Sequence, residues 1–247
     1  TTALAAQQSE FGTASGDRGA LIGILYDLKQ TQRGEPSDVN PRNYPNKLGE
    51  FMASGWDEAV LNEYFRVSRP VYTTQISIPL MSAAQAPEGF GVEEVVKPRA
   101  WVVHYKGQVV VPMDGVYRLA GYADDIIAAR INGDTVLING RPDCFPGNFD
   151  WKPPAPDGLK VGNGRVRYGN WMSLKKDEVV DLDVLVGERP GGKFMAQLLI
   201  QRKGETYPMK DQHPILPLLQ LAESEKKPMT ELDASPPRSS SVWRALR

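Results

Sequence analysis

The chain has 247 residues, of which 41% are hydrophobic and 24% are charged. These values are ordinary for globular proteins, so the composition excludes a chain that is disordered throughout. The 29 basic residues nearly cancel the 30 acidic ones, and the net charge of -1 gives no field that would gather nucleic acid or an anionic membrane. The 23 glycines and 20 prolines favour frequent turns over long helices.

Cys144 is the only cysteine, which excludes an intrachain disulfide and a metal site made of several thiolates. A membrane-spanning helix needs about 18 or more consecutive apolar residues, and the sequence has no such run. Near the start, Ala3-Leu4-Ala5 is typical of a signal-peptidase site. It predicts an exported bacterial protein at the cell surface, in the extracellular space or in the periplasm, although an arbitrary start of the sequence would look the same.

The first part of the chain mixes strand and helix patterns. Residues 20–28 form a short apolar run that predicts a buried strand. In residues 47–65, large apolar side chains recur at helical spacing, which predicts one helix broken near Gly55 or two short helices. Residues 71–80 return to the alternation of a strand.

From residue 100 onward the pattern is a series of strands and turns. Alternating residues predict strands at 101–106 and 116–122, and Asn132-Gly133 predicts a type I′ hairpin between residues 126–131 and 135–138. Residues 180–186 and 194–200 predict two more strands, which we expect to pair across Gly191-Gly192. The sequence therefore predicts a mainly β fold, an antiparallel β-sandwich of jelly-roll type with a small helical insertion and extended terminal arms.

We expect three segments along the chain. Residues 1–18 form an N-terminal arm, residues 19–202 form the sandwich with its helical insertion at about 47–65, and residues 203–247 form a Pro-rich C-terminal arm. The prolines after Lys203 oppose regular structure. The last arm ends in Trp243 and Leu246, which would pack either on their own domain or on a neighbouring chain.

A long irregular stretch separates the two predicted hairpins at residues 141–167. Irregular stretches of this length are uncommon in compact domains and are often functional. Phe145, Phe149 and Trp151 are interleaved here with polar residues such as Asn148. Either the aromatic rings stack on the rings of a bound sugar, or the stretch is a flap whose aromatic side chains pack on the sheet.

Motifs for catalysis are missing from the sequence. There is no nucleophile elbow, zinc-protease motif, phosphate-binding loop or dinucleotide fingerprint. His104 and His213 are the only histidines, and His104 falls within strand alternation, where we expect it on the surface of a sheet. We therefore expect no enzymatic activity.

One segment carries a specific combination of features. Residues 101–140 contain an aromatic strand, a Pro followed by an Asp-Gly turn, the Asp124-Asp125 pair and Ile131-Asn132-Gly133. This combination resembles the core of the anthrax protective-antigen type of β-sandwich domain, which occurs in toxins, yeast flocculins and other adhesins, and as an insertion in some glycosidases. The resemblance extends over about residues 19–202 and implies a sandwich fold.

The resemblance also implies a site. In the sugar-binding members of that family, a cis-linked Asp pair and an Asn from a later loop hold a calcium ion that chelates sugar hydroxyls, so Asp124 and Asp125 are the implied calcium ligands. This sequence departs from the pattern, because Ile126 replaces a Gly and residues 187–193 offer Glu188 but no Asn. The alternative is that the two carboxylates cap the strand end by accepting backbone hydrogen bonds.

Two functions follow from these features. The first is a non-catalytic exported interaction module, a subunit of a surface or extracellular assembly in which Trp243 and Leu246 contact protein partners or further copies of the chain. The alternative is a calcium-dependent, lectin-like or adhesin-like module that binds carbohydrate. Its ligand contacts would be Asp124, Asp125, Phe145, Asn148, Phe149 and Trp151.

Overall fold

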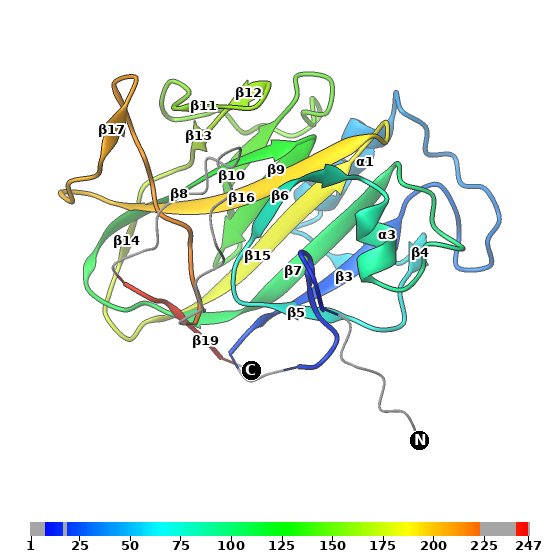
Figure 1. The fold of residues 1–247 in the computed structure, drawn as a ribbon, viewed down its shortest axis with the longest axis horizontal. Helices are drawn as coiled ribbons and strands as arrows, with labels where there is room; N and C mark the ends of the chain where they lie inside the picture. Colours follow the sequence, from blue (N-terminus) through cyan, green and yellow to red (C-terminus); the bar gives the residue numbers. More distant parts are fainter. Residues whose placement is uncertain (1–7, 17–18, 223–240, 247) are drawn as a thin grey trace.

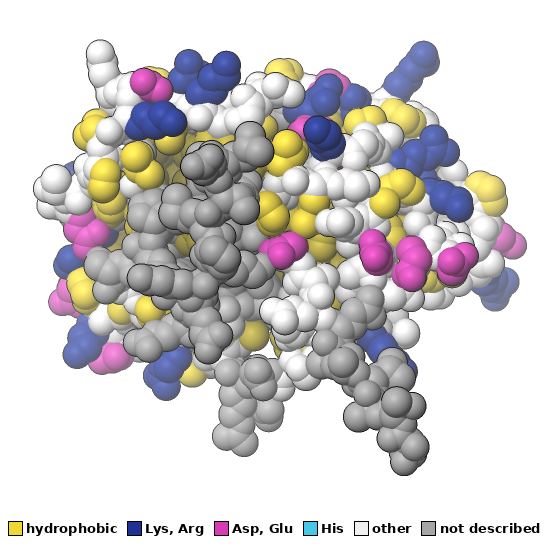
Figure 2. All heavy atoms as spheres, viewed as in Figure 1, with side chains coloured by type: hydrophobic (Ala, Val, Ile, Leu, Met, Phe, Trp, Pro, Cys, Tyr) yellow, Lys and Arg dark blue, Asp and Glu magenta, His cyan; other side chains and the backbone are white. Residues whose placement is uncertain are grey.

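A computed structural model describes residues 8–16, 19–222 and 241–246. Two antiparallel sheets pack against each other, as the ribbon shows (Figure 1). Acidic and basic side chains are scattered over the face seen in Figure 2, in keeping with the net charge of -1. Ala3-Leu4-Ala5 lies outside the described residues. Within the described ranges, no helix has the length and hydropathy required to cross a membrane.

The larger sheet is built mostly from strands in the first and last thirds of the chain. Its order is β1-β2-β5-β3-β7-β15-β9-β10, with β4 beside β3 and β19 beside β7. The strands are β1 (Gln8–Ser9), β2 (Gly12–Thr13), β3 (Leu21–Asp27), β4 (Phe65–Arg66), β5 (Val71–Thr73), β7 (Trp101–Val110), β9 (Ile126–Ile131), β10 (Asp134–Gly140), β15 (Val179–Glu188) and β19 (Arg244–Leu246).

The smaller sheet has the order β13-β8-β16-β6, with β14 also paired to β8. Its strands are β6 (Ser77–Ser82), β8 (Gly115–Asp124), β13 (Arg167–Tyr168), β14 (Met172–Leu174) and β16 (Lys193–Arg202). Two small hairpins stand outside both sheets, β11 (Lys160–Val161) with β12 (Gly164–Arg165), and β17 (Met209–Lys210) with β18 (His213–Pro214). The predicted antiparallel sandwich is confirmed.

Two neighbouring strands of the sequence do not pair as we expected. The prediction that residues 180–186 and 194–200 pair across Gly191-Gly192 is wrong, because β15 pairs with β7 and β9 whereas β16 pairs with β8 and β6. Both edges of β15 are already occupied. The apolar strand β16 therefore joins the smaller sheet and buries its side chains there. The chain crosses between the two sheets at this turn.

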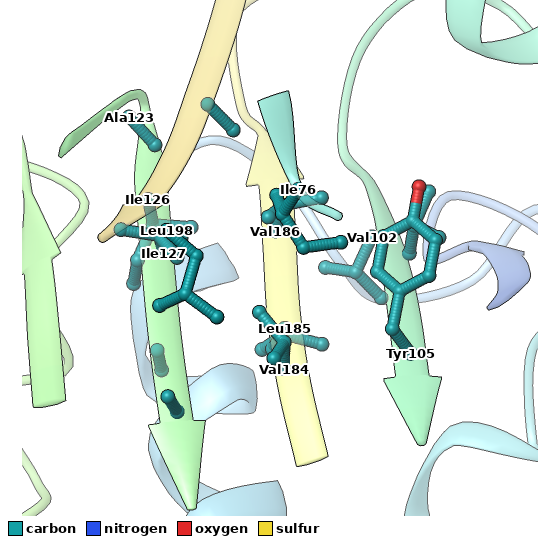
Figure 3. Close-up of a cluster of buried hydrophobic side chains, with 14 of the residues drawn as sticks. Ile76, Val102, Tyr105, Ala123, Ile126, Ile127, Val184, Leu185, Val186 and Leu198 are labelled. Atoms are coloured by element: carbon teal, nitrogen blue, oxygen red, sulfur yellow. The ribbon is translucent and has the colours of Figure 1, made fainter. Parts of the chain in front are cut away.

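The core lies between the two sheets. Figure 3 shows side chains from β7, β9 and β15 with Leu198 of β16 among them. Trp101 of the larger sheet contacts Phe194 of the smaller sheet edge to face at 4.9 Å between ring centroids, and Phe11 lies 5.8 Å from Phe194. Tyr105 satisfies its buried hydroxyl by donating to the Phe11 carbonyl at 3.0 Å.

The helical insertion consists of two short helices, α1 (Tyr44–Ala53) and α2 (Glu58–Leu61), as the broken pattern predicted. Gly55 separates them with a φ of +75°, and the Asp57 side chain caps α2 by accepting from the Ala59 amide. A third helix, α3 (Gln85–Gly89), was not predicted. Trp56 donates to the Thr135 hydroxyl at 3.0 Å, which ties the insertion to the larger sheet.

The insertion changes the position that we expected for His104. Its strand neighbours Trp101 and Tyr105 point into the core, so His104 faces the outer side of the sheet. Phe51 of α1 covers that side, with 5.4 Å between its ring and the imidazole, and His104 is only 2% exposed. The expectation of a surface histidine is therefore wrong, because a periodicity within one strand carries no information about which element covers its outer face.

Parts of both predicted arms contribute to the sandwich, whereas the β17–β18 hairpin of the C-terminal arm stands outside it. Phe11 of the N-terminal arm is buried in the core, and β1 and β2 extend the larger sheet. In the C-terminal arm, β19 pairs with β7, and the Trp243 amide donates to the Gln220 carbonyl. These segments are parts of the domain in this structure.

Candidate functional site

The Asp124-Asp125 pair lies where the chain passes from one sheet to the other. β8 of the smaller sheet ends at Asp124, and β9 of the larger sheet begins at Ile126. The peptide bond between the two aspartates is cis, the conformation that the family resemblance implies. Asp124 is half-buried and lines a pocket, whereas Asp125 is buried beneath it.

The protein itself supplies partners to the Asp125 carboxylate. Oδ2 accepts a hydrogen bond from the Arg189 amide at 2.9 Å, and Oδ1 lies 3.5 Å from Nε of Arg141. The Arg141 amide also donates to the Asp125 carbonyl at 2.9 Å, which fixes Arg141 beside the pair. Asp125 thus has the backbone contact that the strand-capping alternative describes.

Glu188, at the end of β15, completes the buried polar layer under the pair. Oε1 accepts from the Gly191 amide at 2.8 Å, while Oε2 is buried and has no hydrogen-bond partner among the described residues. Burial raises the pKa of both Glu188 and Asp125, and the repulsion between neighbouring carboxylates raises each pKa further.

A pocket of about 670 Å³ opens beside Asp124. The end of β8, the end of β10 with the residues that follow it, and the β11–β12 hairpin form its walls, at the upper edge of the ribbon in Figure 1. Tyr122, which is 6% exposed, is the one aromatic residue of the described lining. The polar side chains around it are Asp124, Asn139, Arg141, Asp157, Lys160, Asn163, Arg165 and Arg167.

The β11–β12 hairpin is held over β8 by its alternating side chains. Leu159, Val161 and Val166 pack in one buried cluster with Tyr122 and Tyr168 on the smaller sheet. The intervening positions are exposed and carry Lys160 and Arg165 toward the pocket. The hairpin sits so close that a Cβ on Gly164 would lie 2.5 Å from the Tyr122 ring.

Asn139 connects the pocket wall to the hairpin. Its side-chain amide donates to the carbonyls of Gly121 and Arg165, both at 2.8 Å, and the residue is 5% exposed. The predicted strand at 135–138 ends before Asn139, and sequence reasoning assigned this residue no role. Because both hydrogens of its buried amide are used, Asn139 holds β8 and the β11–β12 hairpin in place at the pocket.

The four loop residues predicted as ligand contacts do not line this pocket. Trp151 is 8% exposed and packs with Phe145 onto the core, and Phe149 is half-buried there as well. Asn148 donates to the Asn46 carbonyl at 3.0 Å, which ties the loop to the start of α1. In the stretch at 141–167, six polar residues line the pocket, while a ligand role for the aromatic residues and Asn148 stays a prediction.

The residues near Asp124 do not fit a calcium site in this arrangement. Calcium takes about six to eight oxygen ligands. Across the described ranges, no group of three or more His, Cys, Asp or Glu side chains is placed to hold a metal ion. The Arg141 guanidinium already faces Asp125 and would repel a cation there. Calcium binding by Asp124 and Asp125 stays a prediction of the resemblance.

The predicted assembly contacts lie on the domain itself. Trp243 is 2% exposed, and its ring meets Tyr117 edge to face at 5.4 Å. Leu246 pairs with Gln108 in the β19–β7 ladder and is half-buried. Contact of the buried Trp243 with a neighbour would require the segment to leave its own domain, and the assembly role of both residues stays a prediction.

Comparisons with known proteins found neither a matching family model nor a matching curated protein. Among solved structures, the chain is similar to a sugar-binding PA14 domain from an RTX adhesin, with 16% identity, a TM-score of 0.47, and coverage of 80% of this chain and 98% of that one. It is also similar to the PA14 domain of the antifreeze protein MpAFP, with 16% identity, a TM-score of 0.44, and coverage of 78% and 88%. A third similar structure is the epithelial adhesin 6 A domain of Candida glabrata in complex with Galβ1-3GlcNAc, with 10% identity, a TM-score of 0.42, and coverage of 93% and 92%.

Proposed function

We propose that this protein is a carbohydrate-binding module and that the pocket beside Asp124 is its binding site. The observation that carries the proposal is the pocket of about 670 Å³, whose described lining is rich in side chains able to form hydrogen bonds. Its size falls within the range of roughly 300–1,000 Å³ that is usual for small-molecule sites.

The chemistry of the lining suits a sugar. Hydroxyl groups of a saccharide both donate and accept hydrogen bonds, and the pocket offers the Asp124 carboxylate as acceptor and the Lys160 and Arg165 cations as donors. The Asn163 side chain carries both kinds of group. The family resemblance of residues 101–140 implies the same class of ligand.

A glycan array probed with the full chain tests the proposal, once in calcium and once in a chelator, followed by calorimetry on the glycans that bind. We expect Asp124→Ala to weaken binding by about ten- to a hundred-fold, because it removes a charged hydrogen-bond acceptor. Asp134→Ala is the matched control, since Asp134 is an exposed aspartate at the other end of β10. Equal binding by wild type and Asp124→Ala would rule out this pocket as the site.

A further inference from the structure

The pocket has a local charge that the whole chain does not share. Its described lining contains four basic side chains, Arg141, Lys160, Arg165 and Arg167, against the two acidic ones Asp124 and Asp157. The chain as a whole has a net charge of -1, and its charges are scattered over the face in Figure 2. Arg167 and Asp157 neutralise each other through an ion pair at 3.0 Å. Among the remaining lining residues, basic side chains outnumber acidic ones.

Two of these cations face each other across the β11–β12 hairpin. Lys160 and Arg165 are direct cross-strand partners, and both are exposed at the pocket. Like charges in directly opposite positions destabilise a strand pair. Neither side chain forms an ion pair with any part of the chain that the structure describes, and Arg165 makes only a neutral contact, to the Gly158 carbonyl at 3.0 Å. An anion bound between them would remove the repulsion.

The third cation stands beside the aspartate pair. Arg141 is held there by its amide bond to the Asp125 carbonyl, and its Nε lies 3.3 Å from Asp143 Oδ1 and 3.5 Å from Asp125 Oδ1. These contacts use the Nε edge. The two terminal nitrogens of a guanidinium form a second edge that suits a carboxylate or a sulfate, and the side chain is 50% exposed.

We propose that this pocket binds an anionic saccharide without a calcium ion, with Lys160, Arg165 and Arg141 contacting the carboxylate or sulfate of the sugar. The inference rests on the proposed carbohydrate-binding function and adds the class of sugar. Asp124, which comes from β8 instead of the hairpin, remains available to accept hydrogen bonds from sugar hydroxyls.

Calorimetry on the full chain in a chelator tests this inference with matched ligands. The probes are a digalacturonate and its methyl ester, and a sulfated galactose and its unsulfated form, so that carboxylate and sulfate are distinguished. We expect the charged member of at least one pair to bind about tenfold or more tightly than its neutral partner. This preference should shrink in high salt, because exposed charges are screened.

Variants of the hairpin separate binding from folding. Lys160→Gln and Arg165→Gln should each weaken binding of the charged sugar by about ten- to a hundred-fold. The melting temperature of Lys160→Gln should stay equal to wild type or rise, since the change removes a like-charge contact. That of Arg165→Gln should stay close to wild type, because the variant also loses the bond to the Gly158 carbonyl. Lys152→Gln, an exposed lysine of the same stretch that does not line the pocket, is the matched control. Arg141→Gln should lose affinity in the same way.

The remaining outcomes distinguish this inference from the proposed function. Neutral and charged sugars that bind equally well would overturn the inference and leave the proposed function standing, as would binding that appears only in calcium. Failure of every sugar on the array, with and without calcium, would overturn both. Unchanged affinity in both hairpin variants would also overturn the inference.

Discussion

His104 stands at the centre of a charged network between the larger sheet and the helical insertion. Its Nε2 lies 2.9 Å from Asp183 Oδ1, and its Nδ1 lies 3.4 Å from Glu58 Oε1 of α2. Lys106 contacts Glu58 at 2.6 Å, and Arg130 lies 3.7 Å from Asp183. Burial alone would lower the pKa of His104, but the hydrogen bond to Asp183 and the nearby Glu58 carboxylate outweigh it and raise the pKa above 6.5.

This network predicts that stability depends on pH through His104. A histidine whose pKa is raised by folding contributes stability below its unfolded pKa and loses that contribution as pH rises through its folded pKa. In the acid range, the adjacent His104 lowers the pKa of Glu58 from 4.5 to about 2, so the contribution of Glu58 to stability is lost as pH falls from about 4.5 toward 2. We expect His104→Gln to lower the free energy of unfolding more at about pH 5.5 than at about pH 9.

Urea denaturation of wild type and His104→Gln at both pH values measures the effect. Each unit of pKa shift corresponds to about 1.4 kcal/mol of stability. His213→Gln changes the other histidine, which lies in β18 away from this network, and serves as the control. A difference between wild type and His104→Gln that is the same at both pH values would contradict the assignment.

At the scale of elements, the last strand, β19, pairs with the end of β7 in the larger sheet. β19 pairs with β7 at residues 108–110, beyond the end of the β3 ladder, which pairs with residues 101–106 of β7. Trp243, just before β19, fills the space beside Tyr117 of the smaller sheet. A strand of three residues is too short to be stable by pairing alone, so burial of the indole holds it in place.

We therefore expect Trp243→Ala to destabilise the protein by about 3–5 kcal/mol, as is usual for loss of a large buried aromatic side chain. Thermal and urea unfolding of the variant measure the loss. Arg244→Ala, at the exposed neighbouring position, should leave stability within about 0.5 kcal/mol of wild type. A Trp243→Ala variant as stable as wild type would show that the segment does not hold its own domain in solution.

At the scale of the whole molecule, one core joins parts that the sequence separates. Trp56 of the insertion, Trp101 of β7, Trp151 of the long loop and Trp243 near the C-terminus all belong to the same cluster of buried side chains. A shared core couples the unfolding of the elements that contribute to it. The insertion and the described parts of both arms are thus expected to unfold together with the sandwich.

This arrangement predicts a single cooperative transition. Tryptophan fluorescence reports on the insertion, the loop and the C-terminal segment, while far-ultraviolet circular dichroism reports on the strands. We expect both signals to give the same midpoint in urea, because all of these parts contribute to one core. An earlier midpoint in fluorescence, together with fast amide exchange confined to α1 and α2, would show that the insertion unfolds separately.

Much of the fold could be predicted from sequence because it depends on local chemistry. A short apolar run predicts β3, and strand patterning predicts β7, β8, β15 and β16. The positive φ of Asn132 and Gly133 is what a type I′ turn requires. The break at Gly55 follows from local conformational preference as well. Sheet membership could not be predicted, because strand alternation gives a buried face but does not say which strand lies on each edge.

At the candidate site too, some features follow from the local sequence, whereas others depend on how the strands pair. Counted from the Asn132-Gly133 turn, an unbroken two-residue hairpin would place Gly140 opposite Asp125. A bulge between Thr135 and Leu137 shifts the register by one residue, so Gly140 lies opposite Ile126 and the Arg141 amide reaches the Asp125 carbonyl. Asp124 and Asp125 could be singled out from the sequence, but the bulge decides which cation stands beside them.

By itself, the sequence determined the antiparallel strands, their turns and the position of the aspartate pair, because each of these follows from the preferences of neighbouring residues. Only the tertiary structure decided that some polar residues of the long loop line the pocket while its aromatic residues pack on the core. It also decided that His104 and Trp243 are buried. These outcomes depend on which distant elements cover a given face, and burial is a property of the assembled sheets, insertion and terminal strand together.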